Sequence, residues 1–574
     1  MRKNTVINCI GELEKSHEIC YDYINQNSDI RWRIIMYISK LIVKNYKLLK
    51  DVNIELNEKI NIFVGENDSG KSTILEVLSI VTSGKLNGYA FERQVKANMF
   101  NDEARKEYIN SLAAGRPLSP PEIIIEAFLQ DADSRYSGTN NSLLEDACGI
   151  RIRVHFNDEY SELYSSLLSS KEIYDIPVEF YSIDLRYFNG SPVIQRFSPI
   201  KAAFIDTTRK NYAYVVDKFV ADNITNFLTP QNQTDLTTAY RKSRHDFSNS
   251  DIVKQLNDDV RKSTDLDGRE LTIDLKEEDV DSWKSQMSVV VDSCPFENVG
   301  FGTQNTIKMG MVLKNADEQV NVIIMEEPEN NLSYTNMARL VSKVEKSEGK
   351  QVFISTHSSY IANKLDLQNL FLIRKGIPIR FNGLPEDTLS YFKKLPGYDT
   401  LRVVLAEKII LVEGPTDELI IQRAYLDKYN VLPIENGIDI IVVDSLAFKR
   451  YCDITILLNK KTVIVTDNDG NIQNNIINKY TGYTDKPNLI FVYESDEQLH
   501  TIEPSVVAVN FDTEPHEQIF RTVISKRNSM MTKSKDEIID FMTKNKAEWA
   551  LRVFDSEQKI IYPEYIQNAI REFN

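Results

Sequence analysis

The sequence contains little cysteine. Five cysteines are scattered over 574 residues, and no two of them form a CxxC pair. Zinc ribbons and disulfide frameworks need closely spaced or paired cysteines, so this pattern argues against both. A reducing compartment suits such a chain best, and we expect it to act in the cytoplasm.

Long apolar runs are also missing. No stretch approaches the roughly 20 apolar residues that a helix needs to cross a bilayer. The first residues, MRKNTVINCIGELEKSHE, lack the apolar core of a signal peptide. Internal repeats and low-complexity tracts are absent as well. We therefore expect a globular protein that does not associate with a membrane.

Positive charge is in deficit. The formal net charge is -16, which argues against a protein that coats itself in DNA. The segment 521–546 is an exception, because it carries seven basic and three acidic residues. It is interpreted either as a solvated helix face or as part of a local basic groove.

The length and the pattern of strands and helices predict two to four α/β domains. A polar, Lys- and Asp-rich stretch indicates a mostly helical insertion or, alternatively, a partly disordered arm. A cluster of Pro and Gly at 378–397 marks a linker. Alternating short strands and helices after it predict a parallel sheet. The expected parts are an extension (1–35), a first domain in two pieces (36–207 and 296–380), the insertion (208–295), a linker (381–405) and a second domain (406–574).

A glycine-rich loop at 65–72, Gly-Glu-Asn-Asp-Ser-Gly-Lys-Ser, fits the P-loop pattern. It follows an apolar strand and opens a helix, as phosphate binding requires. The glycines let backbone N–H groups turn toward phosphate oxygens, and the helix N-terminus adds a partial positive charge. Lys71 should neutralise the β- and γ-phosphates, and Ser72 should ligate Mg²⁺. The expected ATP-binding residues of the loop are Gly65, Asn67, Gly70, Lys71, Ser72 and Thr73.

A second apolar strand ends in acids at 322–329, Val-Ile-Ile-Met-Glu-Glu-Pro-Glu. This is the Walker B arrangement, in which Glu326 holds the Mg²⁺ of the nucleotide through water and Glu327 polarises the attacking water. His357 follows a further strand, Val-Phe-Ile-Ser-Thr, and is a candidate for a switch histidine. A lone histidine is otherwise more often structural.

Two acidic motifs lie in the last third of the chain. Glu413 ends a predicted strand, and Asp417 starts the next helix. Asp467 and Asp469 flank an asparagine at the end of another strand. Alternate residues of a strand point to the same side, so we expect both aspartates to reach one ion. Four carboxylates above adjacent parallel strands form a hard oxygen site that suits Mg²⁺ or Mn²⁺.

These motifs resemble those of a known family. The order of P-loop, Glu-Glu-Pro-Glu and Ser-Thr-His-Ser is similar to the ABC/SMC-type ATPases, in particular the overcoming-lysogenization-defect (OLD) family. The pairing of Glu-Gly-x-x-Asp with Asp-x-Asp resembles the Toprim domain. The resemblance covers roughly residues 36–555. It implies an α/β fold in which an ABC-type ATPase domain with a helical insertion precedes a parallel-sheet, Rossmann-like Toprim domain.

The resemblance also implies roles for further residues. Gly302, in Val-Gly-Phe-Gly-Thr-Gln, occupies the place of the signature that contacts the γ-phosphate of the opposite subunit, although it departs from the LSGGQ form. Glu503 matches an acid that helps hold a second metal, and Lys546 matches a lysine that stabilises charge on the scissile phosphate. ATP sandwiched between subunits implies at least a dimer, and the insertion lies where the family places its dimerisation helices.

The leading hypothesis is an ATP-regulated DNA endonuclease or nickase, with two Toprim ions and one ion held with ATP. Members of the family serve in bacterial anti-phage systems, some with a helicase and others with a retron reverse transcriptase and its multicopy single-stranded DNA. A topoisomerase-like strand-passing enzyme is an alternative, although no helix-turn-helix unit with a nucleophilic tyrosine is evident. A nucleotide-switched scaffold with a structural metal is another.

Overall fold

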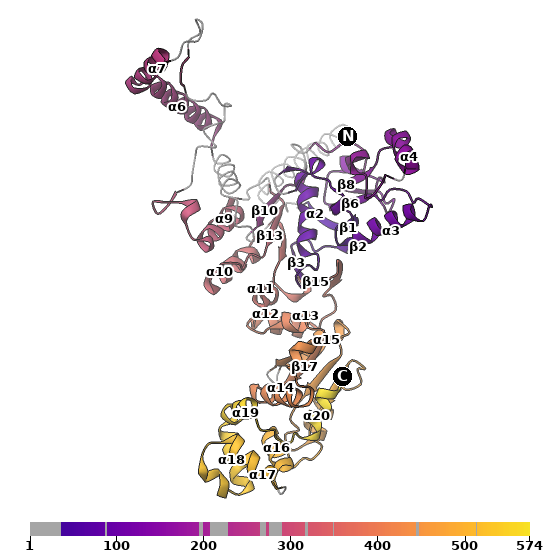
Figure 1. Cartoon of the computed structure of the whole chain (residues 1–574), viewed down its shortest axis with the longest axis vertical. Helices are drawn as coiled ribbons and strands as arrows, with labels where there is room; N and C mark the ends of the chain where they lie inside the picture. Colours follow the sequence, from indigo (N-terminus) through magenta and orange to yellow (C-terminus); the bar gives the residue numbers. More distant parts are fainter. Residues whose placement is uncertain are drawn as a thin grey trace, which may run out of the picture.

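The computed structural model describes residues 36–573, apart from 87–88, 171, 195–198, 207–227, 264–270, 275–289, 316–319, 348, 444–446 and 512–513. The predicted extension at 1–35 lies outside the described residues. Figure 1 shows an elongated molecule in which the C-terminal third forms a separate body below the rest. We call residues 36–380 the N-terminal unit and residues 406–573 the C-terminal unit.

A six-stranded sheet forms the centre of the N-terminal unit, in the order β10-β13-β14-β3-β15-β16. Its first five strands pair in parallel, and the edge strand β16 is antiparallel. The strands are β10 (Ala202–Asp206), β13 (Val322–Glu326), β14 (Gln351–Ser355), β3 (Ile60–Val64), β15 (Leu370–Arg374) and β16 (Ile377–Arg380). Parallel strands present their carboxyl ends at one edge, so the P-loop and the acids after β13 lie at the same edge.

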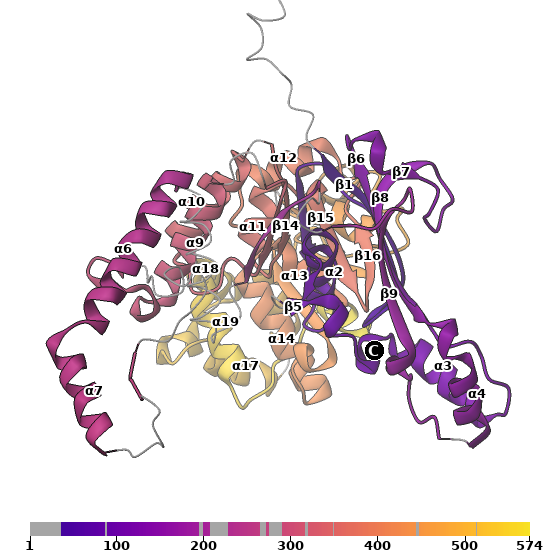
Figure 2. The same ribbon diagram turned by 90° about the horizontal axis from the view of Figure 1, so that it is seen from above.

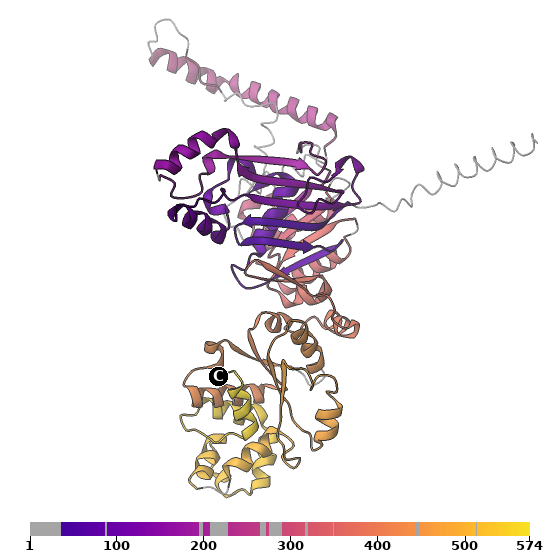
Figure 3. The ribbon, with the colours of Figure 1, turned by 90° about the vertical axis from the view of Figure 1, so that its right-hand side faces the viewer.

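Helix α2 (Lys71–Ser83) lies between this sheet and an antiparallel one. Four apolar residues on one side of this helix, Ile74, Leu75, Leu78 and Val81, are all fully buried. They share a core with Val322 and Ile324 of the parallel sheet and with residues of the antiparallel sheet, whereas Ile323 and Met325 face a different core. The antiparallel strands are β2 (Leu49–Glu55), β1 (Tyr37–Tyr46), β6 (Ile123–Gln130), β8 (Ala147–Phe156), β7 (Ser137–Gly138) and β9 (Tyr181–Tyr187). Figure 3 shows these long strands across the upper body.

Two helices form a projecting arm. The described parts of the predicted insertion contain α6 (Pro230–Ser248) and α7 (Asp251–Ser263), so they are mainly helical. Figure 2 shows this arm on the opposite side of the molecule from α3 (Asp102–Ala113) and α4 (Ser161–Ser170). Much of the insertion lies outside the described residues, and its role in dimerisation stays a prediction.

The C-terminal unit has a four-stranded parallel sheet in the order β18-β17-β19-β20. The predicted parallel sheet is present, and its strands are β17 (Lys408–Val412), β18 (Ile438–Val442), β19 (Thr462–Val465) and β20 (Leu489–Val492). The surrounding helices are α14 (Pro415–Tyr429), α15 (Phe448–Leu457), α16 (Ile502–Asn510), α17 (His516–Ile524), α18 (Lys535–Lys544), α19 (Lys546–Asp555) and α20 (Glu564–Arg571).

The predicted linker at 381–405 contains two helices, α12 (Glu386–Lys394) and α13 (Thr400–Leu405). Phe392 and Val404 are fully buried, in one apolar cluster with Ile354 of β14 and Ile464 of β19. Pro and Gly therefore mark the turns around these helices, while apolar residues between the turns join the cores of the two units. Among the described residues, no helix is long and apolar enough to cross a bilayer.

Candidate nucleotide and metal sites

The P-loop connects β3 to α2, and both of its glycines are needed. Gly70 has φ 111°, a left-handed conformation that glycine adopts without strain. A Cβ added to Gly65 would lie 2.5 Å from the carbonyl oxygen of Ile373. The loop is also tied to β15 and β16, because the Gly376 amide donates to the Ser69 carbonyl at 2.8 Å. The predicted loop geometry is present.

Lys71 folds back across this loop. Its Nζ donates to the carbonyl oxygens of Gly65 at 2.9 Å and Glu66 at 2.8 Å. Burial lowers the pKa of the Lys71 amine, while the nearby carboxylates of Glu327 and Asp68 oppose that shift. The amine is therefore held inside the loop, and its contact with phosphate stays a prediction. Asn67 and Ser72 are exposed beside it, and Thr73 is buried.

The Walker B acids lie close to the predicted switch histidine. Glu326 is buried at the end of β13, next to Ser355 of β14. Glu327 has φ 44°, and its Oε1 lies 3.5 Å from His357 Nε2. Asn330 donates to the other oxygen of Glu327 at 2.8 Å. Strain at a non-glycine residue is typical of functional positions, and here it directs Glu327 toward His357.

Glu329 has a role that the sequence analysis did not assign. Its Oε1 accepts hydrogen bonds from Thr356 Oγ1 at 2.8 Å and from the His357 amide at 2.7 Å. Burial raises the pKa of this carboxyl group. Glu329 therefore fixes the end of β14, from which His357 projects, to the Walker B loop. Its place in the Glu-Glu-Pro-Glu motif was the available signal.

Gly302 lies in the first turn of α9 (Phe301–Asn315). A Cβ at this position would be 2.3 Å from the carbonyl oxygen of Asn331. Asn305 of the same helix donates to the carbonyl of Asn330 at 3.3 Å. The glycine thus lets α9 pack closely on the Walker B loop of its own chain. Its contact with nucleotide on an opposite subunit stays a prediction.

Glu413 and Asp417 flank the start of α14. Glu413 directly follows β17, and the Asp417 Oδ2 accepts a hydrogen bond from the Gly414 amide at 3.0 Å. A carboxylate here satisfies a free amide and interacts favourably with the helix dipole. Asp417 therefore has a structural role in addition to the metal-binding role predicted for it.

Glu413 reaches the neighbouring strand end. Its Oε1 accepts hydrogen bonds from Thr466 Oγ1 at 2.5 Å and from the Asp467 amide at 3.2 Å. The parallel pairing of β17 and β19 places these residues side by side. The two acidic motifs, about 50 residues apart in sequence, are therefore adjacent in space. Thr466 was not identified from the sequence.

Strand alternation does not explain the positions of Asp467 and Asp469, so that argument was wrong. β19 ends at Val465, and Asp469 has φ 47° in the loop that follows. Asn468 between them is 1% exposed and donates to the carbonyls of Glu494 and Asp496 at 2.9 and 3.0 Å. This buried side chain anchors the loop, and Asp467 and Asp469 are the more exposed residues on either side.

Glu503 and Lys546 also lie together. Glu503 is fully buried in the first turn of α16, and its Oε1 lies 3.5 Å from Lys546 Nζ at the start of α19. Thr501 donates to the other oxygen of Glu503 at 2.9 Å. The lysine side chain is 51% exposed, so its amine faces both Glu503 and solvent.

Charge repulsion links these acids into one site. Burial, together with repulsion from Glu413 and Glu503, raises the pKa of Asp417 to about 7. Burial, together with repulsion from Asp417 and Glu413, raises the pKa of Asp467 to about 8. A divalent cation relieves such repulsion, and carboxylate oxygens are the ligands that Mg²⁺ prefers.

The side chains are not set in a closed metal cage. Within the described ranges, no three acidic, histidine or cysteine side chains are grouped closely enough to hold one ion as they stand. Glu413 and Asp417 instead accept protein hydrogen bonds. The donor types and their mutual repulsion fit a divalent cation.

Tyr565 of α20 is a further neighbour of the site. Burial raises the pKa of its hydroxyl well above the ordinary value, and the carboxylates of Asp417 and Asp467 raise it further. The sequence offered no signal for this residue, because it lies about 100 residues beyond the acidic motifs.

A family model described as an AAA ATPase domain matches residues 36–293 and 285–362, more than half of the chain. The chain belongs to this AAA ATPase domain family. A second model, described as an overcoming lysogenization defect protein-like TOPRIM domain, matches residues 404–469. The protein is thus an ATPase–Toprim fusion of the OLD type, as predicted, and its two domains imply the use of ATP and of a divalent metal. The Toprim match includes Glu413 and Asp467, whereas Glu503 and Lys546 lie beyond it.

Other comparisons cover short segments or distant folds. The DNA replication and repair protein RecF of Bacillus cytotoxicus is 30% identical over 60 residues, which are 10% of this chain and 16% of RecF. RecF of Glaesserella parasuis is 42% identical over 50 residues, 9% of this chain and 14% of RecF. The OLD-type chain therefore spans about a sixth or less of these relatives. The solved SMC head bound to the C-winged helix domain of ScpA has a TM-score of 0.32 and 15% identity, covering 60% of this chain and 97% of that one.

Proposed function

We propose that this protein is an ATP-regulated, divalent-metal-dependent DNA endonuclease or nickase. The observation that carries the proposal is the meeting of Glu413 with the Asp467 loop at the carboxyl ends of β17 and β19. Active sites of open parallel sheets lie at this edge. The raised pKa values of Asp417 and Asp467 support the same location, since perturbed acids cluster at functional sites.

In this proposal the acids of the Toprim domain hold two ions of Mg²⁺ or Mn²⁺. Bound ions would lower the pKa of an attacking water and accept charge from the leaving oxygen. The five proposed ligands are Glu413, Asp417, Asp467, Asp469 and Glu503. Lys546, half exposed at the rim, contacts the scissile phosphate and stabilises its added charge.

The ATPase domain regulates that reaction. Lys71 binds the β- and γ-phosphates, Ser72 and Glu326 hold the ion that accompanies ATP, and Glu327 polarises water with His357 beside it. Gly302 of a second copy completes the site, so that the active form is at least a dimer. The RecF relatives are named for DNA replication and repair, which is consistent with DNA as the substrate.

We also propose that the protein acts in the cytoplasm as the effector of a bacterial anti-phage system. The described cysteines, Cys148, Cys294 and Cys452, are free thiols, as a reducing compartment favours. No feature of the described residues selects a helicase or a reverse transcriptase with its DNA, so neither partner is part of the proposal.

Supercoiled plasmid incubated with Mg²⁺ or Mn²⁺, with and without ATP, tests the activity. Nicked and linear products are expected, at a rate that changes with ATP. Ladders of relaxed circles would instead support a topoisomerase, and unchanged plasmid would support a scaffold. The Asp467→Ala variant serves as the control against a contaminating nuclease.

A further inference from the structure

A short helix connects the nucleotide site with β18 and β19. These are the two strands that flank β17, the strand that Glu413 follows. Helix α13 (Thr400–Leu405) lies between the two domains, and two residues separate it from the start of β17. Its residues Leu401, Val403 and Val404 are buried in the apolar cluster that the domains share. Because packed interiors do not deform continuously, a displacement of one end of α13 moves the other.

The N-terminal end of α13 is bound to the segment that follows His357. Ser359 Oγ donates to Asp399 at 2.5 Å and accepts from the Leu401 amide at 3.3 Å. Asn363 donates to the Tyr398 carbonyl at 2.7 Å and accepts from Thr400 Oγ1 at 2.5 Å, where both side chains are buried. Ser359 and Asn363 both belong to α11 (Ser359–Lys364), which starts two residues after His357. A movement of α11, which lies just after His357, would therefore move the N-terminal end of α13 with it.

The C-terminal end of α13 is held by Lys460, which precedes β19. Lys460 Nζ donates to three carbonyl oxygens, those of Val403 at 2.9 Å, Val404 at 2.5 Å and Ala406 at 2.6 Å. The residue is 5% exposed, and burial lowers the pKa of its amine to about 7. Free carbonyls at a helix end attract a cation. Lys460 thus attaches the end of α13 to the strand that leads to Asp467.

Arg402 attaches the same helix to the other flank. Its guanidinium forms two hydrogen bonds with Asp439 of β18, at 2.6 and 3.1 Å, and one with the Ile440 carbonyl at 3.0 Å. Strands β18 and β19 lie on either side of β17, the strand that Glu413 follows. Helix α13 is therefore attached to both neighbours of β17. Arg402 binds β18, and Lys460, just before β19, binds the end of the helix.

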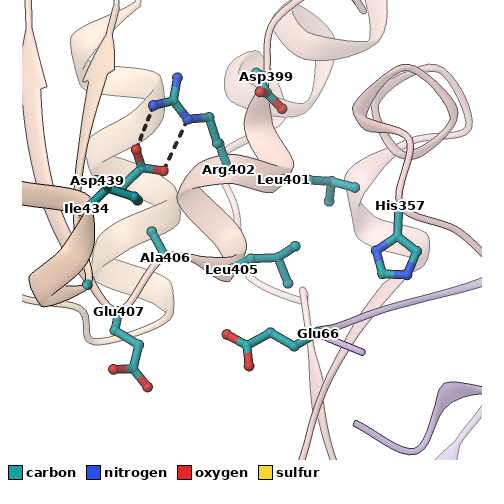
Figure 4. Close-up of a pocket in the computed structure, with 11 residues that line it drawn as sticks. Glu66, His357, Asp399, Leu401, Arg402, Leu405, Ala406, Glu407, Ile434 and Asp439 are labelled. Carbon is teal, nitrogen blue, oxygen red and sulfur yellow. Dashed lines mark hydrogen bonds and ion pairs between the residues drawn. The ribbon is translucent and has the colours of Figure 1, made fainter. Parts of the chain in front are cut away.

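A cavity lies beside α13, between the nucleotide loop and the Toprim sheet. It has a volume of about 530 Å³ and is lined by Glu66 of the P-loop, by His357 and, on the Toprim side, by Gly437 and Asp439. Figure 4 shows the Arg402–Asp439 pair on one side of this space and His357 on the other. The space directly connects the nucleotide loop with the base of the Toprim sheet.

We propose that α13 transmits the nucleotide state of the ATPase domain to the acids of the Toprim domain, with Lys460 as the positioning residue on the Toprim side. This inference rests on the proposed function, in which ATP regulates cleavage. A change at Glu327 and His357 moves α11, α11 moves α13, and Lys460 and Arg402 carry the shift into β19 and β18. Glu413 and Asp467 then change their separation, which sets how well they hold metal.

The test is amide hydrogen exchange of residues 462–469 in the full-length protein, with and without a non-hydrolysable ATP analogue. In the unsubstituted protein the analogue should change the exchange rate by at least about fivefold, the lower end of ordinary coupling. Lys460→Met should remove this response, and Lys460→Arg should restore part of it because arginine still donates to carbonyls. Lys461→Met, at an exposed neighbour paired with Glu572, is the matched control and should respond normally.

Nucleotide affinity is measured alongside and should not change in any of these variants. If Lys460→Met does not fold, Arg402→Met, whose side chain is 44% exposed, carries the same expectation of a reduced response. An unsubstituted protein without a nucleotide response at 462–469, or a folded variant at Lys460 with a full response, overturns the proposal. Plasmid cleavage is assayed separately: a protein that responds in exchange but cuts no DNA refutes the nuclease and supports the coupling.

Discussion

Lys546 Nζ lies 3.5 Å from Oε1 of Glu503, although 42 residues and two helices separate them along the chain. Glu503 is fully buried and its partner is half exposed. The pair places one positive charge at the rim of an otherwise acidic site. The amine is therefore free on one side to meet a phosphate that approaches the metal-binding acids.

Replacing that amine tests its part in catalysis. Lys546→Ala should slow DNA cleavage by about 100-fold or more, the usual loss when one group that stabilises transition-state charge is removed. Lys544→Ala is the control, because Lys544 is exposed and pairs with Asp540 one turn earlier. Rates are compared at saturating metal. Equal rates for both variants would show that Lys546 does not contact the reacting phosphate.

The acids nearest the strand ends should be indispensable for cleavage. Glu413→Ala or Asp467→Ala removes a proposed ligand from the metal site, and we expect cleavage to fall below detection while ATP hydrolysis continues at its normal rate. The exposed Asp485, in the loop before β20, gives a control variant, Asp485→Asn, that should cut DNA normally. Cleavage that persists in both alanine variants would mean that the metal site has been assigned to the wrong residues.

Stability should depend on pH and metal together. The pKa values of Asp417 and Asp467, about 7 and about 8, are raised above the ordinary 3.8. Between about pH 4 and 8 the folded state binds more protons than the unfolded state, so the free energy of unfolding without metal should fall as pH rises. Mg²⁺ competes with these protons.

Thermal unfolding at pH 6 and pH 8.5, with and without Mg²⁺, measures this linkage. The rise in melting temperature caused by Mg²⁺ should be larger at pH 8.5, because the carboxylates are then already ionised. Asp417→Asn removes one titrating group and should reduce the difference between the two pH values. A metal effect that is independent of pH would contradict the linkage.

The nucleotide site makes a separate prediction. Glu327→Gln keeps the hydrogen bond from Asn330 but loses the charge beside His357, so it should bind ATP normally and hydrolyse it at least about 100-fold more slowly. Lys71→Ala is the comparison, since it should abolish binding itself. Titration of a fluorescent ATP analogue and a phosphate-release assay separate binding from turnover. Normal turnover in Glu327→Gln would assign the water-polarising role to another residue.

Two glycines near the start of α9 form a matched pair. Gly302→Ala places a methyl group against the Asn331 carbonyl, where the available distance is only 2.3 Å. Overpacking of this kind costs about 1–3 kcal/mol, and we expect a lower melting temperature together with reduced ATP hydrolysis. A Cβ at Gly300 meets nothing within 4 Å. Gly300→Ala should therefore behave like the unsubstituted protein in both measurements.

The sequence by itself determined the local frameworks of both sites. Strand, glycine loop and helix are consecutive in the P-loop, and Glu413 and Asp417 lie on either side of the start of α14. Such features follow from backbone geometry over a few residues. The spacing of the glycines and the lysine therefore predicts the P-loop, and the spacing of the two acids predicts their place around the start of a helix. The parallel sheet of the C-terminal unit was predicted for the same reason, since short apolar runs bounded by polar residues define buried parallel strands.

Only the tertiary structure decided which distant groups meet. The pairing of β17 with β19 brings Glu413 to Asp467, and the folding of the C-terminal unit brings Glu503 at the start of α16 to Lys546 at the start of α19. The tertiary structure also shows that the Pro- and Gly-rich connection contains α12 and α13. It places the buried amine of Lys460 against the carbonyls at the end of α13. These contacts depend on how apolar faces from separate segments share one core, and residue spacing along the chain does not encode that arrangement.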